Sequence, residues 1–457
     1  MVAFVNLRRL LLGTLAACLL VLPVTPAFAA RSSVDGYLDD WQRSNGVPGV
    51  AVAVLDGEET STWLIGRDGR GRPMTSNTPL LVGSVAKTMT STMVLQLVDE
   101  ARVALDDSAQ AHLPWLGHRA TVRQLLTHTA GYSAADGLAV SERHRPELTV
   151  TAAARELEHT GVIGDYRYSS ANYLVLGALI ERLTGNPFAS ELRTRITERA
   201  GMTGTDASGP SAAASRGHRL WWGHPWVHDP GPEPSGAPYG YVVSTLDDLV
   251  TYARAQLGGE LTSTASRSAA WSEQAGPESG YGYGWRIDTG DGSRRVHHTG
   301  ATPGHFAHLM LMPDRNRAVV VLANAYSEAR APSLAAAAAD IDRLHQGRDA
   351  SPTTGDAMLT GLPWLTLAPA ALAVAAIVVL LRRRPKTGGV TLVLIGASVL
   401  VAGLLALAPM LLGTTWHVVG TWTPDAALGL IAGIAGWLAV VLLLALPGRR
   451  RGPQADT

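Results

Sequence analysis

The sequence predicts an α+β globular domain followed by three transmembrane helices. Strand-like segments lie near both ends of residues 32–345 and bracket an alanine-rich, amphipathic middle. Residues 361–446 instead hold three apolar stretches, each long enough to cross a bilayer as a helix. We therefore expect a mixed domain at residues 32–345, a linker at 346–360 and a membrane region at 361–446.

The strand pattern is clearest in two places. Val50–Leu55 and Ser61–Ile65 flank Asp56-Gly57, a dipeptide that favours a tight hairpin turn. Ala307–Met312 and Arg317–Ala323 form a similar pair near the end of the domain. Strands from both ends of the domain are therefore expected to frame a helical middle.

The membrane region carries its basic residues in two clusters. The apolar spans run over Gly361–Leu381, Gly389–Leu412 and Ala426–Leu446. Arg382–Lys386 separates the first two spans, and Arg449–Arg451 follows the third. Positive charge beside membrane spans stays in the cytoplasm, so we expect residues 30–360 outside the cytoplasm and a cytoplasmic tail at 447–457. The lipid bilayer is thus an expected partner, and the spans are expected to act as an anchor.

The first 29 residues are expected to form a secretory signal. Arg8 and Arg9 precede an apolar run, and Ala27-Phe28-Ala29 matches a cleavage site of small residues. Two alternatives stay open: an uncleaved membrane anchor, and lipidation of Cys18 after Leu15-Ala16-Ala17. Cys18 is the only cysteine in the sequence, so a chain cleaved after Ala29 would have no disulfide and no thiolate nucleophile.

The charge balance excludes some classes of partner. The chain has 38 basic and 38 acidic side chains, so no excess of positive charge favours nucleic acid. Only two of the basic residues, Lys87 and Lys386, are lysines, and the rest are arginines. Lys87 is thus the only lysine outside the membrane region.

Lys87 follows a serine at helical spacing. A helix is expected to begin near Ser84, which places the Ser84 hydroxyl and the Lys87 amine on one face of its first turn. A serine needs a neighbouring base to become a nucleophile, and a desolvated lysine can supply it. Ser-x-x-Lys also occurs as a helix cap beside a solvated lysine. Because arginine cannot act as a base, a lysine in this arginine-rich chain favours Ser84 as the nucleophile.

Two further motifs carry polar groups. Tyr168-Ser169-Ser170 supplies a phenol, which can relay a proton to a leaving group when nearby positive charge lowers its pKa; a core tyrosine is the alternative. His298-Thr299-Gly300-Ala301 precedes the last strand pair. Its glycine would let a substrate backbone approach, and the amide of Ala301 would join that of Ser84 in binding an oxyanion. Neither motif is specific by itself.

Taken in order, these motifs resemble the serine β-lactamase and DD-peptidase (penicillin-binding-protein) superfamily, especially its class C-like and esterase-like branch. The resemblance covers about residues 35–330 and also includes Thr121–Gly131, Gly201-Met202-Thr203 and Tyr283-Gly284-Trp285. It implies a β-lactamase/transpeptidase-like fold, in which an antiparallel sheet is flanked by helices and a helical subdomain. The catalytic serine would lie between the two parts.

The resemblance implies three catalytic and five substrate-binding residues. These are the acyl-accepting nucleophile Ser84, its base Lys87, the proton relay Tyr168, and the substrate-contacting Ser170, His298, Thr299, Gly300 and Ala301. Within this set, His298 takes the place of the family's third-motif Lys or His. The amides of Ser84 and Ala301 would form the oxyanion hole.

One position departs from the family pattern. The second motif commonly ends Tyr-x-Asn, whereas Ser170 stands at the third place here and Asn172 lies two residues later. A serine has no amide to contact an acylamide side chain, and it would restrain Lys87 less. The departure weakens the expectation of efficient β-lactam hydrolysis more than the expectation of an acyl-enzyme.

No metal or other cofactor is expected. Five histidines follow the middle of the domain: His218, His224, His228, His305 and His308. They show no ligand spacing with one another or with nearby carboxylates. The family likewise uses no metal.

The expected function is that of a membrane-anchored, extracytoplasmic serine hydrolase. It would act through an acyl-enzyme on a cell-wall D-amino peptide, a small ester or a β-lactam-like amide, with peptidoglycan as one source of substrate. The alternative is a non-catalytic or single-turnover sensor of cell-wall fragments or β-lactams that signals through the membrane spans.

Overall fold

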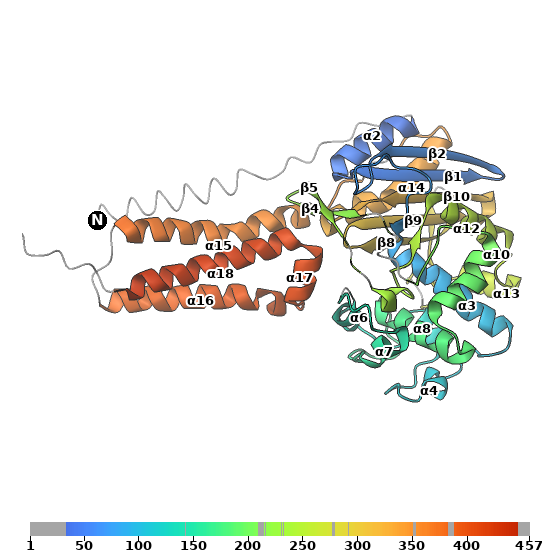
Figure 1. The fold of residues 1–457 in the computed structure, drawn as a ribbon, viewed down its shortest axis with the longest axis horizontal. Helices are drawn as coiled ribbons and strands as arrows, with labels where there is room; N and C mark the ends of the chain where they lie inside the picture. Colours follow the sequence, from blue (N-terminus) through green and yellow to red (C-terminus); the bar gives the residue numbers. More distant parts are fainter. Residues whose placement is uncertain are drawn as a thin grey trace, which may run out of the picture. The chain divides into compact units, whose positions relative to one another are not determined.

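The described residues of the computed structural model (Figure 1) form two compact units, one that ends at Gly355 and one that begins at Asp356. It describes residues 33–141, 143–208, 214, 216–229, 231, 233–276, 279–290, 292–350, 353–382 and 388–446. The expected signal segment, the tail at 447–457 and, apart from Arg382, the basic cluster between the first two spans lie outside these residues.

Within the described residues, a six-stranded antiparallel sheet forms the centre of the globular unit. Its strand order is β2-β1-β10-β9-β8-β7, so strands from both ends of the domain meet in the middle of the sheet. The bounds are β1 Gly49–Asp56, β2 Glu59–Gly66, β7 Arg286–Gly290, β8 Ser293–Thr302, β9 His305–Met312 and β10 Arg317–Ala323. Both expected hairpins, β1–β2 and β9–β10, are present.

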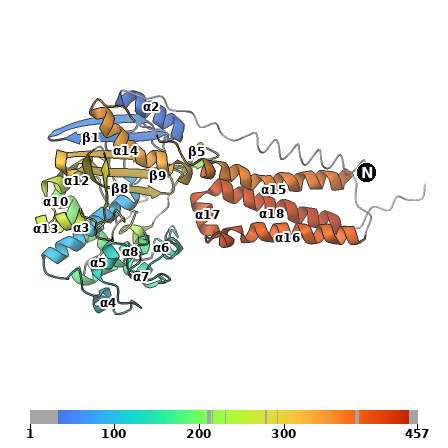
Figure 2. The ribbon, with the colours of Figure 1, turned by 180° about the vertical axis from the view of Figure 1, so that it is seen from behind.

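Helices cover both faces of this sheet (Figures 1 and 2). The helices α2 (Val34–Asn45) and α14 (Ala331–His345) pack on one face, and α12 (Leu246–Gly258) packs on the other. Side chains alternate along a strand, so Val50 and Val52 join the core under α2 and α14, whereas the intervening alanines join the larger core. The central strands β1, β9 and β10 are therefore buried on both faces.

The larger core continues into the helical subdomain. Its two main helices are α3 (Ala86–Asp99), preceded by a 3₁₀ turn at Gly83–Val85, and α8 (Ser170–Thr184). Shorter helices surround them: α4 Ala109–His112, α5 Val122–Leu126, α6 Ala134–Val140, α7 Val150–Arg155, α9 Phe188–Leu192, α10 Glu198–Ala200 and α13 Thr264–Ala270. Every residue of α3 from Ala86 to Leu97 is buried. Its first turn therefore has fixed surroundings.

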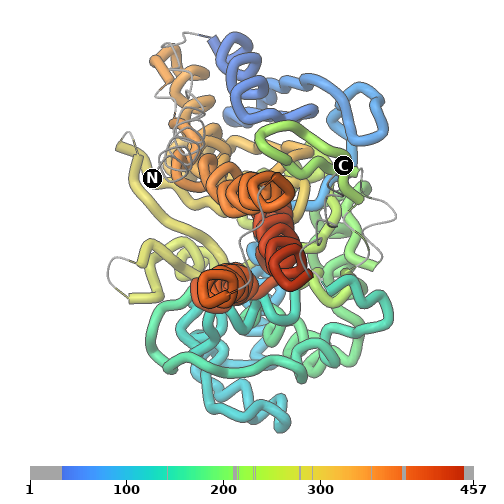
Figure 3. Tube along the Cα trace, turned by 90° about the vertical axis from the view of Figure 1, so that its left-hand side faces the viewer, coloured from blue at the N-terminus to red at the C-terminus, as the bar shows by residue number. Residues whose placement is uncertain are grey.

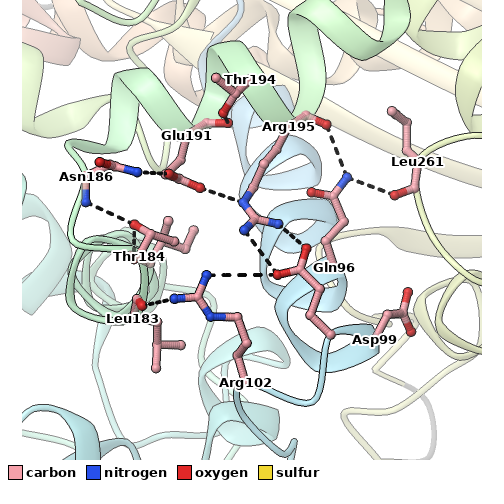
Figure 4. Close-up of polar contacts among 12 residues, drawn as sticks. Gln96, Asp99, Arg102, Leu183, Thr184, Asn186, Glu191, Thr194, Arg195 and Leu261 are labelled. Atoms are coloured by element: carbon pink, nitrogen blue, oxygen red, sulfur yellow. Dashed lines mark hydrogen bonds and ion pairs between the residues drawn. The ribbon is translucent and has the colours of Figure 1, made fainter.

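A polar network holds the far end of α3 against α9 (Figure 4). Arg195 forms ion pairs with Glu100, at 2.6 Å, and with Glu191, at 2.5 Å. Gln96 donates to the backbone oxygens of Arg195 and Leu261. Because charged hydrogen bonds are stronger than neutral ones, this network stabilises α3 at the end opposite Ser84.

Two small sheets complete the globular unit. One contains β4 (Gly217–Trp221), β5 (His224–His228) and β11 (Ala325–Tyr326), and the other pairs β3 (Leu80–Leu81) with β6 (Val243–Ser244). The β3–β6 pair extends to a hydrogen bond of 3.0 Å from the Val82 amide to the Val242 oxygen. It thereby places the loop before β6 beside the nucleophile turn.

The second unit contains helices that run side by side (Figures 1 and 2) and are seen end-on in Figure 3. They are α15 (Ala357–Arg382), α16 (Gly389–Leu411) and α18 (Pro424–Ala445), with the short α17 (Trp416–Trp422) before the last. Among the described residues, these three long helices have the length and apolar composition needed to cross a membrane. Gly429 allows close packing of α18 on α15, since a Cβ there would lie 2.4 Å from Thr366 Oγ1.

Candidate active site

Ser84 and Lys87 lie in contact at the start of α3. Ser84 is in the 3₁₀ turn and is partly exposed, whereas the Lys87 side chain is completely buried. Lys87 Nζ lies 2.9 Å from Ser84 Oγ. A helix cap beside a solvated lysine is thus excluded for this pair, because Lys87 has no exposed surface.

Two further oxygen atoms surround the Lys87 amine. Nζ lies 2.8 Å from the Tyr239 carbonyl oxygen and 3.3 Å from Ser170 Oγ. The carbonyl comes from the loop that the β3–β6 pair holds next to Ser84. A carbonyl can only accept a hydrogen bond, so one amine proton is directed to Tyr239, away from the nucleophile.

Ser170 reaches the site because it is the first residue of α8. Ser169 caps this helix, its side chain accepting a hydrogen bond from the Ala171 amide. Asn172 is fully buried and donates to the Ser169 carbonyl at 3.2 Å. The structure thus places a hydroxyl, and not the Asn172 amide, beside Lys87.

Tyr168 precedes this helix and makes a side-chain hydrogen bond with Ser84. Burial raises the pKa of the Tyr168 hydroxyl to about 12, although the hydrogen bond to Ser84 and the charge of Arg286 both act to lower it. Nearby positive charge, the condition given above for a relay tyrosine, is present in Arg286, but desolvation outweighs its effect on the pKa. At neutral pH Tyr168 is a phenol that can donate a proton.

His298 lies inside the domain beneath the site. Its side chain is 1% exposed, and its ring centre is 6.0 Å from that of Tyr168. Burial, followed by the charges of Arg286 and Lys87, holds the pKa of His298 well below its usual value. His298 is therefore neutral and does not supply the positive charge that a third-motif lysine would carry.

Gly300 brings β8 against the nucleophile turn. A Cβ at Gly300 would lie 2.0 Å from the Val82 oxygen and 2.7 Å from the Ser84 nitrogen. Because Gly300 has no side chain, the backbone of the turn from Val82 to Ser84 can lie directly against β8. Contact between Gly300 and a substrate backbone stays a prediction.

The outer edge of β8 is open next to Ser84. In the described part of the chain, β7 pairs with β8 from Ser293 to His297 and goes no further. Thr299 and Ala301 are partly exposed and project to the opposite strand face from His298. Their side chains therefore lie on the opposite face of β8 from His298, in a part of the strand that β7 does not pair with.

Arg286 is a charged residue of the site that the sequence-based assignment missed. Its guanidinium carbon lies 5.1 Å from the centre of the Tyr168 ring and 5.8 Å from that of Tyr281, and it hydrogen-bonds Tyr166. Its position directly after Tyr283-Gly284-Trp285 was the available signal. The Tyr239 carbonyl gave no signal, since a backbone oxygen leaves no mark on sequence.

The histidines near the middle of the domain take structural positions. His218 and His308 are buried, and His218 Nδ1 lies 2.9 Å from the Asn324 carbonyl oxygen. In the described ranges, no group of three or more His, Cys, Asp or Glu side chains is arranged to hold a metal ion.

The globular unit is similar to known proteins over almost its whole length. Residues 31–343 match the family model described as Beta-lactamase. Penicillin-binding protein 4 of Amycolatopsis lactamdurans is 29% identical over 316 residues, covering 61% of this chain and 81% of that protein. This chain covers 53–62% of the length of several other curated relatives.

Solved structures give the same relationship. A D-stereospecific amidohydrolase from Streptomyces sp. has a TM-score of 0.53 at 28% identity, covering 62% of this chain and 90% of that one. The octameric penicillin-binding protein homologue from Pyrococcus abyssi has a TM-score of 0.60 at 21% identity, covering 69% and 77%. The second likeness concerns the fold alone. The predicted fold class and the resemblance on which it rested are confirmed.

Proposed function

Because this chain belongs to the beta-lactamase family, we propose that it is a membrane-anchored serine hydrolase that transfers an acyl group to Ser84 and then to water. The observation that carries the proposal is the 2.9 Å contact between the Ser84 hydroxyl and the fully buried Lys87 amine. Burial favours the neutral form of an amine. A neutral Lys87 can direct its lone pair to Ser84 while its two protons bond Tyr239 and Ser170.

Acylation then needs two proton transfers. Lys87 takes the hydroxyl proton as Ser84 Oγ bonds the substrate carbonyl carbon. When the carbon–nitrogen or carbon–oxygen bond breaks, Tyr168 gives its phenol proton to the leaving group, and the Lys87 ammonium reprotonates it. The pKa of about 12 supports this order of events, since the phenol holds its proton at neutral pH. In deacylation, water takes the place of the leaving group and the same proton transfers run in the opposite order.

We propose a D-amino peptide or amide, or a small ester, as substrate ahead of a β-lactam. The likeness to a D-stereospecific amidohydrolase supports this class. The open edge of β8 suits an extended peptide backbone, with the amides of Ser84 and Ala301 as oxyanion donors. Ser170 offers no amide for an acylamide side chain. Arg286 is the charged group nearest Tyr168 that a substrate carboxylate would meet.

The test is covalent labelling of the full chain in detergent. A fluorophosphonate probe should label the wild-type chain and leave Ser84→Ala unlabelled. Ser91→Ala is the matched control, because Ser91 is a buried serine on the same helix whose hydroxyl donates to the Tyr283 oxygen. Labelling that survives in Ser84→Ala would overturn the nucleophile.

A substrate panel separates the enzyme from a sensor. D-Ala-D-Ala peptides, D-amino amides, short esters and a chromogenic cephalosporin would be incubated with the purified chain. We expect repeated turnover of a peptide, amide or ester. A single stoichiometric acylation with no turnover would instead support the sensor that signals through the spans.

A further inference from the structure

A path of buried side chains joins the second and third motifs behind the nucleophile. His128 Nδ1 lies 3.2 Å from the Ser169 amide nitrogen, and His128 Nε2 lies 3.1 Å from the Tyr281 hydroxyl. The same hydroxyl is 3.1 Å from His298 Nε2, and His298 Nδ1 is 2.6 Å from the Thr299 carbonyl oxygen. The three side chains of this path are buried.

The two ends of the path determine the direction of every hydrogen bond in it. The Ser169 amide can only donate, so His128 Nδ1 accepts and, in a neutral ring, Nε2 carries the proton. The Thr299 carbonyl can only accept, so His298 Nδ1 carries the proton and Nε2 accepts. The Tyr281 hydroxyl therefore accepts from His128 and directs its proton to His298, while Tyr173 is a further hydrogen-bond partner of the same hydroxyl outside the path.

We propose that His128 and Tyr281 are positioning residues that hold His298 neutral and lock β8 at Thr299 against the Tyr168–Ser170 turn. While Tyr281 donates to His298, a proton on His298 Nε2 would face the Tyr281 hydroxyl proton. An imidazolium would require Tyr281 to turn its proton to Tyr173, so the path opposes the charged ring. The inference rests on the proposed function only in the test that measures labelling of Ser84.

The surroundings of His298 also oppose a positive charge on its ring. Positive or titratable groups face His298 from the neighbouring segments. They are Lys87 of α3, Arg286 of β7, His297 of its own strand, Tyr168 of the turn before α8 and Tyr281 of the segment before β7. A charged His298 would repel Arg286, and it would also repel Lys87 in the ammonium form that follows proton uptake from Ser84. His128 also packs on Tyr168, with ring centres 4.4 Å apart. The neutral path thus keeps Lys87 and Tyr168 in the arrangement that acylation needs.

The first test removes one hydroxyl. Tyr281→Phe should slow fluorophosphonate labelling of Ser84 by about tenfold, since small displacements of reacting groups are costly. Tyr132→Phe is the matched control, because the buried Tyr132 hydroxyl also bonds a histidine, His118, at 2.8 Å outside the path. Equal labelling rates in wild type and Tyr281→Phe would overturn the proposal.

The second test follows the protonation of His298 directly. Magic-angle-spinning NMR of the ¹⁵N-histidine-labelled full chain in liposomes, with His298 assigned by its loss in His298→Asn, should show a neutral ring down to pH 5. His128→Leu frees the Tyr281 oxygen to accept from His298, so the pH at which this ring gains a proton should rise above that of the wild type. His128→Gln should restore the wild-type behaviour, because its amide can donate to Tyr281 and accept from Ser169.

The two readouts separate this inference from the proposed function. An unlabelled wild-type chain would contradict the hydrolase, while the NMR titration would still decide the path. A His298 that titrates in the wild type, or one that gains a proton at no higher pH in His128→Leu than in the wild type, would overturn the path whatever the labelling result.

Discussion

Lys87 has a buried amine with oxygen acceptors in three directions, at Ser84, Ser170 and Tyr239. These three oxygen atoms hold the lysine side chain in one position beside the nucleophile. Lys87 would take a proton from Ser84, whereas Tyr168 would give its proton to the leaving group. The two residues therefore suit opposite parts of one acylation cycle.

The first prediction concerns Lys87→Arg. Arginine keeps the positive charge but does not lose a proton in proteins, so we expect the labelling rate of Ser84 to fall by about 10²- to 10⁴-fold. Stopped labelling reactions on the purified chain would measure this, with thermal unfolding as the control for folding. A near-normal rate would show that Lys87 is structural.

At the scale of elements, the site depends on backbone contact between β8 and the turn before α3. Gly83 and Gly300 face each other there: a Cβ at Gly83 would lie 2.3 Å from the Ala301 nitrogen. Gly83 also has a φ of 52°, which side chains other than glycine rarely adopt. The two proposed oxyanion donors are thus brought together by two glycines from segments more than 200 residues apart.

The second prediction is that Gly300→Ala disrupts this contact. The added methyl group would meet the Val82 oxygen and push β8 away from Ser84, so the labelling rate should drop by about tenfold or more. Gly117→Ala serves as the control, because a Cβ at Gly117 meets nothing within 4 Å. Unchanged labelling in Gly300→Ala would show that Ser84 reacts normally without this contact between β8 and the turn before α3.

At the scale of the whole molecule, the globular unit buries several neutral histidines. Burial lowers the pKa of His118 to about 4 and of His228 to about 3, and holds three others well below the usual value. These three are His128, His298 and His308. In the unfolded chain each would titrate near pH 6.5.

The third prediction follows from the sign of these shifts. Below about pH 6.5 the unfolded chain binds protons that the folded chain excludes. The free energy of unfolding should therefore decrease as the pH is lowered. Each excluded proton contributes about 1.4 kcal/mol per pH unit. Thermal unfolding of the full chain in detergent between pH 7.5 and 4.5 measures the effect. A midpoint temperature that stays constant or rises on acidification would contradict it.

The fourth prediction concerns membrane topology. A reporter that is active only after export should be inactive when fused after Lys386 and active when fused after Gly413, in the loop between α16 and α17. The basic residues after α15 are the physical reason, since they favour the cytoplasmic side. Activity after Lys386 together with inactivity after Gly413 would reverse the orientation.

Much of the fold was predictable because its signals are local. The segments Val50–Leu55 and Ser61–Ile65 on either side of Asp56-Gly57 predict the β1–β2 hairpin, and the composition of residues 361–446 predicts α15, α16 and α18. The position of α15 shows the limit of such signals, because it begins at Ala357, four residues before the expected span. Asp356 precedes the helix, and its carboxylate accepts a hydrogen bond from the Leu359 amide at 2.9 Å. The expected span was placed by apolar composition and did not use this capping signal.

The site was predictable in part. Ser84 and Lys87 share one helical turn, so their spacing in sequence already brings them together. Tyr239 and Arg286 reach the site through strand pairing, and no local pattern marks them. The Asn172 amide was correctly expected to miss the third place of the second motif, and the structure adds that it binds the Ser169 carbonyl instead.

By itself, the sequence determined the fold class, the apolar helices and a serine with a lysine one turn later, because each depends on residues close together in the chain. Only the tertiary structure decided that Lys87 is buried, that Tyr168 holds its proton and that His298 is neutral. These three outcomes depend on desolvation and on hydrogen bonds between distant segments. Burial of a group is a property of everything packed around it, and so it appears only once the chain has folded.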